Sequence, residues 1–226
     1  MKKYLLLLII IIISSCTTTD NFYLNGDIKG LKKGTIVLSK SIKNSEIVLD
    51  SINLNGDSNF TLSCFLNEPE VLKIKLTNSG LNNDEIYFFA NEGVTDFKTN
   101  LKRFVYEADF NGSLQQRKLD EFKKMMTKYN EENLNLIKNQ IELYNNEDEI
   151  IIINQKLVNL KKREMFYIIN FTINNSNSEV SPFIANKYLN DINIKYLDTI
   201  YKSLEESIKN SKYGLILKKK LTKEGN

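Results

Sequence analysis

The stretch FVYEADFNGSLQQRKLDEFKKMMTKY, residues 104–129, decides the fold because two periodicities meet inside it. Phe104–Phe110 completes a series of β-type segments, whereas residues from Phe122 onward form an apolar stripe with three- and four-residue steps, as on a helix. Asn111-Gly112-Ser113 separates the two patterns, and Ser113 is a favourable N-cap for the helix. The sequence therefore predicts a segregated α+β protein, with strands first and helices second.

Upstream of this stretch, residues 22–110 predict an antiparallel β-sandwich. Phe60–Cys64 and Leu72–Leu76 alternate apolar and polar side chains with a period of two, and Asn55-Gly56-Asp57 is a strong turn signal. Many short strands separated by Gly and Asn at regular spacing are typical of sandwiches and barrels. Cys64 falls on the apolar face of its strand, so we expect a core residue rather than a reactive thiol.

Downstream, residues 111–226 predict a helical domain with a long antiparallel αα-hairpin. One apolar stripe runs to Asn145-Asn146 and a second follows Asp148, so each helix would be about 25–30 residues long. A short polar turn between long helices implies antiparallel packing. Shorter helices follow, with Pro182 in a first turn and Asp191 as a cap. The stripes consist of Phe122, Met126, Tyr129, Asn133, Ile137, Ile141 and Tyr144, and of Ile150, Ile153, Leu157, Leu160, Glu164, Tyr167 and Phe171.

The segment Ile150–Ile153 is apolar on every side of its helix and must therefore be covered. It packs either between the hairpin partner and the rest of the chain, or against a second protein that docks there. An aspartate at Ile152 that left the stability of the monomer unchanged would show that this position is not core.

The first residues predict export from the cytoplasm. A basic start at Lys2 and Lys3 precedes an unbroken apolar run, Tyr4–Ile13, which is the pattern of a signal peptide covering residues 1–15. The apolar run is about half as long as the roughly 20 residues that a membrane-spanning helix needs. A transmembrane anchor is therefore the weaker interpretation.

The end of this segment predicts a lipid anchor. Ser14-Ser15-Cys16 is similar to a bacterial lipobox, in which cleavage between Ser15 and Cys16 leaves the cysteine to carry the lipid. An ordinary signal peptide with an incidental cysteine is the alternative. With a lipidated Cys16, residues 16–21 form a polar tether, and we expect the protein on the periplasmic face or the surface of a bacterial cell envelope, joined to the membrane through its lipid.

Composition excludes several classes of site. The chain has no His, which removes the commonest general base and nitrogen ligand for metals, and its second cysteine, Cys64, has no C-x-x-C partner. No Walker-type or G-x-G-x-x-G loop is present, so we expect no catalytic, cofactor-binding or metal-binding residues. Removal of residues 1–15 leaves 29 basic against 28 acidic side chains, which gives no reason to expect a nucleic-acid partner.

Diffuse turn and core patterns resemble a bacterial domain of unknown function, DUF4369. The similar segments are Phe22–Leu31, Gly34–Leu38, Asp50-Ser51 with Gly56 and Phe60, Phe88-Phe89 with Glu92-Gly93, Phe110–Ser113 with Gln115, Ser181–Ala185, Leu197–Tyr201 and Ser211–Gly214. The resemblance implies a lipoprotein module that, in many relatives, precedes a thioredoxin-like domain that reduces disulfides. Because the chain contains no C-x-x-C, that activity is not carried over.

Three functions remain as hypotheses. The first is a non-catalytic, lipid-anchored envelope module that binds a protein or another envelope component. The second is an accessory partner that works in trans with a separate thioredoxin-like reductase. The third is a hydrolase that uses carboxylates, which would require two of them in one deep pocket.

Overall fold

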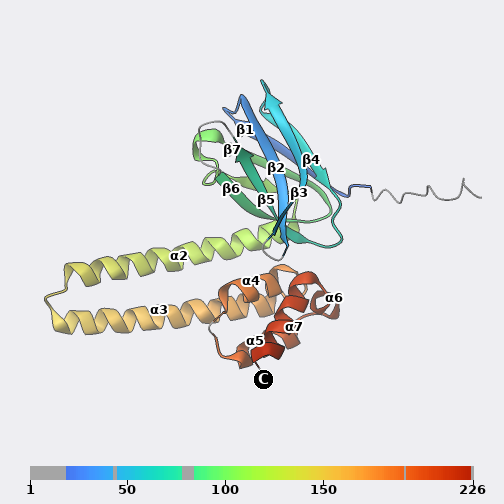
Figure 1. Ribbon diagram of the computed structural model, residues 1–226. Coiled ribbons are helices and arrows are strands. Elements are labelled where there is room, and N and C mark those ends of the chain that lie inside the picture. The colour runs from blue at the N-terminus through green and yellow to red at the C-terminus, as the bar shows by residue number, and fades with distance from the viewer. Residues whose placement is uncertain (1–18, 43–44, 78–83, 191, 225–226) are drawn as a thin grey trace, which may run out of the picture.

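The computed structural model describes residues 19–42, 45–77, 84–190 and 192–224. Its strands form two sheets that face each other, and the helices lie at one end of this sandwich (Figure 1). The predicted α+β fold, a β-sandwich followed by helices, is thus confirmed. The first sheet has the order β4 (Asn59–Cys64), β1 (Phe22–Lys29), β7 (Gly93–Asn100), β8 (Asp109–Asn111); the second has the order β3 (Ser45–Asn55), β2 (Lys33–Ile42), β5 (Glu70–Thr77), β6 (Asp84–Ala90).

Alternating side chains fill the space between the sheets, as the period of two requires. Leu72, Ile74 and Leu76 of β5 are all buried in this core, as is Cys64 at the end of β4. Burial raises the pKa of the Cys64 thiol to about 12. Cys64 is therefore a core residue, as predicted, and not a reactive thiol.

One strand pair departs from the antiparallel prediction. β1 and β7 run parallel, with Phe22 opposite Gly93 at one end and Lys29 opposite Asn100 at the other. A parallel pair requires a long connection, and here all the strands from β2 to β6 lie between its two members in the chain. The other pairs of the described sheets are antiparallel.

The predicted strand at Phe104–Phe110 is wrong over most of its length. A short 3₁₀ helix at Leu101–Arg103 and a turn precede β8, which is confined to Asp109–Asn111. Phe104 is nevertheless buried, because the turn directs its ring edge-on to Phe97 at a centroid distance of 6.2 Å. The apolar residues in this segment therefore reflect a buried turn and not an alternating strand.

The predicted hairpin and its cap are confirmed. α2 (Leu114–Glu142) and α3 (Glu147–Asn174) pack side by side, and the backbone N–H of Gln116 donates to Ser113 Oγ at 3.2 Å. Asp191, the predicted cap of a later helix, lies outside the described residues; the side chain of Asn193 caps α5 instead. The shorter helices are α4 (Val180–Tyr188), α5 (Ile194–Ser203), α6 (Glu206–Lys209) and α7 (Lys212–Glu224).

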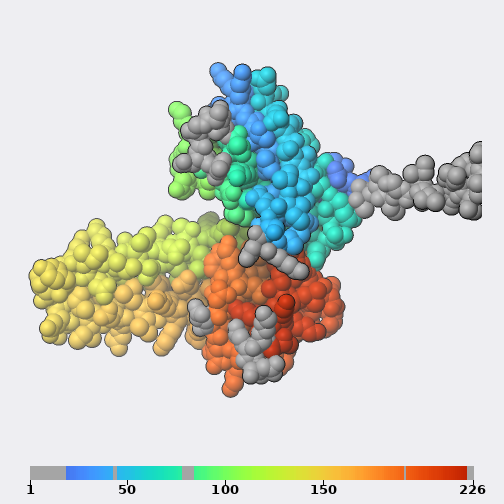
Figure 2. Space-filling view, in the orientation of Figure 1, coloured from blue at the N-terminus to red at the C-terminus, as the bar shows by residue number. Residues whose placement is uncertain are grey.

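The helices have a second hydrophobic core, to which the second sheet also contributes. Phe89 of β6 points away from the sandwich core, and its ring lies 5.5 Å from that of Phe183 and 5.6 Å from that of Tyr213. The shorter helices and the base of the hairpin therefore pack against the second sheet. The rest of the hairpin projects beyond both cores (Figures 1 and 2).

Candidate functional site

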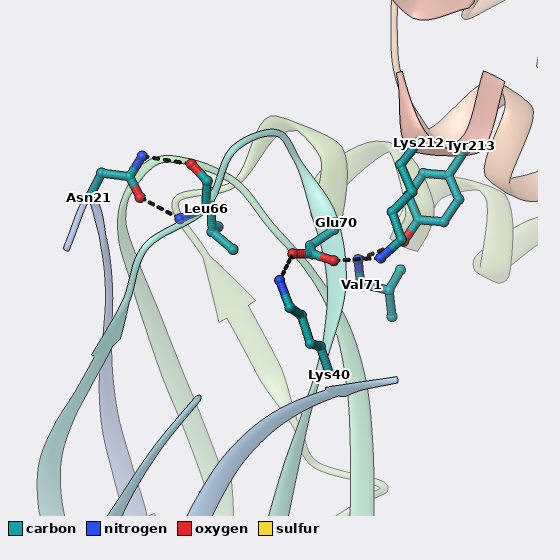
Figure 3. Close-up of polar contacts among 7 residues, drawn as sticks. All are labelled: Asn21, Lys40, Leu66, Glu70, Val71, Lys212 and Tyr213. Atoms are coloured by element: carbon teal, nitrogen blue, oxygen red, sulfur yellow. Dashed lines mark hydrogen bonds and ion pairs between the residues drawn. The ribbon is translucent and has the colours of Figure 1, made fainter. Parts of the chain in front are cut away.

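The predicted lipidation residue, Cys16, and the predicted cleavage residue, Ser15, lie outside the described residues. The described chain begins at residue 19, and Asn21 fastens it to the sandwich (Figure 3). Asn21 Nδ2 donates to the carbonyl of Leu66 at 2.8 Å, and Asn21 Oδ1 accepts from the N–H of Leu66 at 2.7 Å. The predicted tether, residues 16–21, therefore ends at a fixed point on the sandwich.

A polar clamp joins the last helix to β5. The carboxylate of Glu70 accepts hydrogen bonds from the ammonium groups of Lys40, at 2.8 Å, and Lys212 (Figure 3). The N–H of Val71 donates to the hydroxyl of Tyr213 at 2.8 Å. Because Glu70 and Tyr213 are both buried, these contacts hold the start of α7 against the sandwich.

The clamp makes stability depend on pH. Burial alone would raise the pKa of Glu70, but the ammonium groups of Lys212 and Lys40 lower it below the ordinary 4.5. A carboxyl with a lowered pKa stabilises the fold above pH 4.5, and this contribution is lost as the pH falls below that value. We expect Glu70→Gln to reduce the free energy of unfolding at pH 7 by about 1–3 kcal/mol and to flatten its decline in acid. Urea unfolding between pH 3 and pH 7 measures both effects; parallel curves for the two proteins would contradict this account.

Aromatic side chains fix the base of the hairpin. The ring of Phe122, which is fully buried, lies 5.2 Å from that of Phe171 and 5.0 Å from that of Tyr188. Gln116, also buried, accepts a hydrogen bond from the N–H of Phe89 on β6 at 2.7 Å. α2, α3, α4 and the sandwich are thereby tied together, so that the hairpin extends from a firm support.

The outer part of the hairpin is held by fewer contacts. Ile153 and Leu160 of α3 are buried there, and the amide of Gln140 donates to Asn154 Oδ1 at 2.8 Å. Glu132 of α2 and Arg163 of α3 form an ion pair between the two helices. The outer part of the hairpin thus consists of α2 and α3 alone, whereas α4 also packs against its base.

The structure corrects the predicted stripe of α2 in its outer half. Ile137, Ile141 and Tyr144 were expected to face α3, but all three are exposed. Asn133 of the predicted stripe is partly buried, but the next partly buried positions are Leu136 and Gln140, each one residue before the predicted one. Both rows are apolar near Leu136, so the helical period alone does not distinguish the row that faces α3.

Ile150–Ile153, which was expected to be covered either by the rest of the chain or by a second protein, is only partly covered by the chain itself. Ile153 is buried and Ile150 is half-buried, but Ile151 and Ile152 are exposed. Together with the row on α2, this leaves a group of large apolar side chains in contact with water. We call it the outer hairpin face; its members and exposed fractions are Leu134 (65%), Ile137 (37%), Ile141 (68%), Tyr144 (72%), Ile151 (63%) and Val158 (53%).

On α2, the exposed apolar residues lie on the same side of the helix as the residues near the base that α4 approaches. Thr127 and Asn130 line a cavity that Tyr188 of α4 also lines. Steps of four and three residues lead from Asn130 to Leu134 and Ile137 along the same side of the helix.

On α3, too, the exposed apolar residues lie on the side of the helix that α4 approaches near the base. Met165 and Lys161 line a cavity that Tyr188 also lines, and steps of three and seven residues lead on to Val158 and Ile151. Both rows therefore lie on the side of the hairpin that α4 covers near the sandwich. The outer hairpin face is the uncovered continuation of that side.

A separate cavity of about 440 Å³ lies where β8 meets α2, and Asp120 and Glu121 line it. Burial raises the pKa of Asp120, whose carboxylate accepts a hydrogen bond from Gln116 at 2.7 Å. Lys123 lies 4.0 Å from the same carboxylate, and burial lowers the pKa of its ammonium group. These contacts join Asp120 to the support of the hairpin.

Two further observations concern the described residues only. No group of three or more Cys, Asp or Glu side chains there could hold a metal ion. Among the same residues, no helix has the length and apolar character that crossing a membrane requires.

Comparison with known proteins identifies the sandwich. Residues 22–119 match the family model described as Domain of unknown function (DUF4369), so the match ends within the second turn of α2. It does not include residues 181–214, where the sequence suggested further resemblance. Neither a curated protein nor a solved structure matches the chain. Residues 22–119 therefore form a domain of the DUF4369 family of domains of unknown function.

Proposed function

We propose that this protein is a non-catalytic, lipid-anchored module of the bacterial cell envelope that binds another protein through its outer hairpin face. The observation that carries this proposal is the exposure of six large apolar side chains on one side of a projecting arm. Contiguous exposed apolar surface of this kind is characteristic of interaction sites.

Charge favours a protein over a membrane as the partner of this face. The turn of the hairpin is flanked by four acidic side chains, Glu142, Glu147, Asp148 and Glu149. An anionic membrane surface repels such a tip. In Figure 1 the turn also lies on the far side of the molecule from the start of the coloured chain, where the predicted tether ends.

The anchor is tested at Cys16. We expect Cys16→Ser to abolish metabolic labelling of the protein with a radioactive fatty acid, because the thiol that would carry the lipid is gone. Labelling of the variant at the level of the unchanged protein would contradict the lipoprotein assignment.

The binding face is tested by adding charge to it. We expect Ile137→Asp combined with Ile141→Asp to reduce co-purification of envelope proteins, an untagged second copy of this chain included, with the tagged full chain at least tenfold, because each carboxylate would lose its hydration on binding. Asn135→Asp combined with Asn139→Asp is the matched control, since it adds the same charge to exposed positions of the same helix outside the face.

Both double variants should keep the free energy of unfolding within about 0.5 kcal/mol of the unchanged protein, because the substituted residues are exposed. Equal co-purification by the two variants would exclude this face. Recovery of a thioredoxin-like reductase as the partner would identify the protein as an accessory factor that works in trans.

A further inference from the structure

We propose that the outer hairpin face binds the same face of a second copy of this chain, with the two hairpins antiparallel, so that four helices form one bundle. This inference rests on the proposed function, since it names the partner of the face described above. Two-helix layers that pack face to face are the usual architecture of four-helix bundles. At its base, this side of the hairpin already receives a helix, α4.

The charges along α3 favour the antiparallel direction. Glu147 and Asp148 stand at the tip, and Lys161 and Lys162 lie 14 residues further along, about 21 Å from it. All four are exposed, and no ion pair within the described residues engages them. Antiparallel hairpins place each acidic tip beside the basic residues of the other copy, whereas parallel hairpins would bring the two acidic tips together.

One register satisfies charge and apolar contact together. When Glu147 lies opposite Lys162 of the second copy, Ile151 lies opposite its Val158. The two-fold axis then passes α3 between Asn154 and Gln155. Every contact is repeated by symmetry, as an interface between identical patches requires.

The same axis fits the apolar row of α2. The hydrogen bond from Gln140 to Asn154 shows that these two residues lie at the same level of the hairpin. An axis that passes α3 beside Asn154 therefore crosses α2 near Gln140 and Ile141. Ile141 then lies close to Ile141 of the second copy, and Ile137 lies opposite its Tyr144. The hydrogen-bonded pair Gln140–Asn154 stands at the centre of the interface, where a polar group can fix the register of packed helices.

Cysteine cross-linking in the native envelope tests this arrangement on the full chain. We expect Ile141→Cys to form a disulfide-linked species of twice the chain mass on oxidation, because the two thiols meet near the axis. Leu134→Cys is the control on the same face: in the antiparallel bundle its two copies are about 20 Å apart along the helix, so no dimer should form. Cys64 is buried and should leave the unchanged chain monomeric on the gel.

The outcomes separate this inference from the proposed function. A dimer through Leu134→Cys without one through Ile141→Cys would overturn the antiparallel arrangement. An adduct of Ile141→Cys with a different protein would overturn the second copy as partner and leave the proposed function standing. The absence of any adduct at either position would overturn both.

A charge exchange provides an independent check. Asp148→Lys combined with Glu147→Lys should reduce the cross-linking of Ile141→Cys at least tenfold, and adding Lys161→Glu with Lys162→Glu should restore it. Failure of the second pair to restore the cross-link would contradict the proposed register.

Discussion

Gly112→Ala is expected to reduce the free energy of unfolding by about 3–5 kcal/mol. Gly112 has a φ of +123°, a conformation that L-residues rarely adopt. A β-carbon there would also lie 2.2 Å from the carbonyl oxygen of Val94 and 3.1 Å from Cα of Thr95. Because Gly112 connects β8 to the N-cap of α2, relief of this clash would move the strand, the hairpin or both.

Gly56→Ala is the matched control for this prediction. Gly56 has a similar φ, +103°, but a β-carbon there would have nothing within 4 Å. We expect it to lose only about 1–2 kcal/mol, the cost of the backbone conformation alone. Urea unfolding of both variants gives the comparison; equal losses would show that the close approach to β7 does not matter.

Phe122→Ala is expected to reduce the free energy of unfolding by about 3–5 kcal/mol, the range for removal of a buried phenylalanine side chain. The ring of Phe122 lies 5.9 Å from that of Tyr167 and 5.2 Å from that of Phe171, both on α3. It also contacts the ring of Tyr188 on α4. Its loss should therefore also increase hydrogen exchange along α2 and α3.

Phe166→Ala serves as the control within the same hairpin. The side chain of Phe166 is 46% exposed and meets only the edge of Tyr196 among the described aromatic rings. We expect Phe166→Ala to reduce the free energy of unfolding by about 1 kcal/mol or less and to leave hydrogen exchange in α2 unchanged. Similar losses in the two variants would contradict the role of Phe122 as the support of the arm.

The sequence predicted those parts of the fold that local patterns determine. The alternation in Leu72–Leu76, the turn at Gly56 and the cap at Ser113 each act within a few residues, and all three appear in the structure. The burial of Cys64 followed from the same alternation.

Features that depend on distant segments were not predictable in this way. The parallel pairing of β1 with β7 is decided by which strands meet across the sandwich, not by the pattern within either strand. Phe104 looked like a strand residue because burial in a turn and burial in a strand select the same side chain.

The candidate site was predictable only in part. The excess of apolar residues at Ile150–Ile153 indicated either packing or docking, and the exposure of Ile151 and Ile152 now favours docking. The row on α2 was assigned to the wrong side, because Leu136 and Ile137 are both apolar and lie on adjacent rows of the helix. Only the packed position of α3 distinguishes them.

A partner that covers the outer hairpin face in the envelope should protect it from thiol labelling, which is the most direct test of the proposed function. Ile141→Cys, in the middle of the face, is compared with Asn135→Cys, which lies outside it on the same helix. Each full-chain variant is reduced and treated with a membrane-impermeant maleimide, first in its envelope and then in urea. We predict that, relative to its rate in urea, Ile141→Cys reacts at least tenfold more slowly than Asn135→Cys in the envelope; equal relative rates would contradict the proposed function.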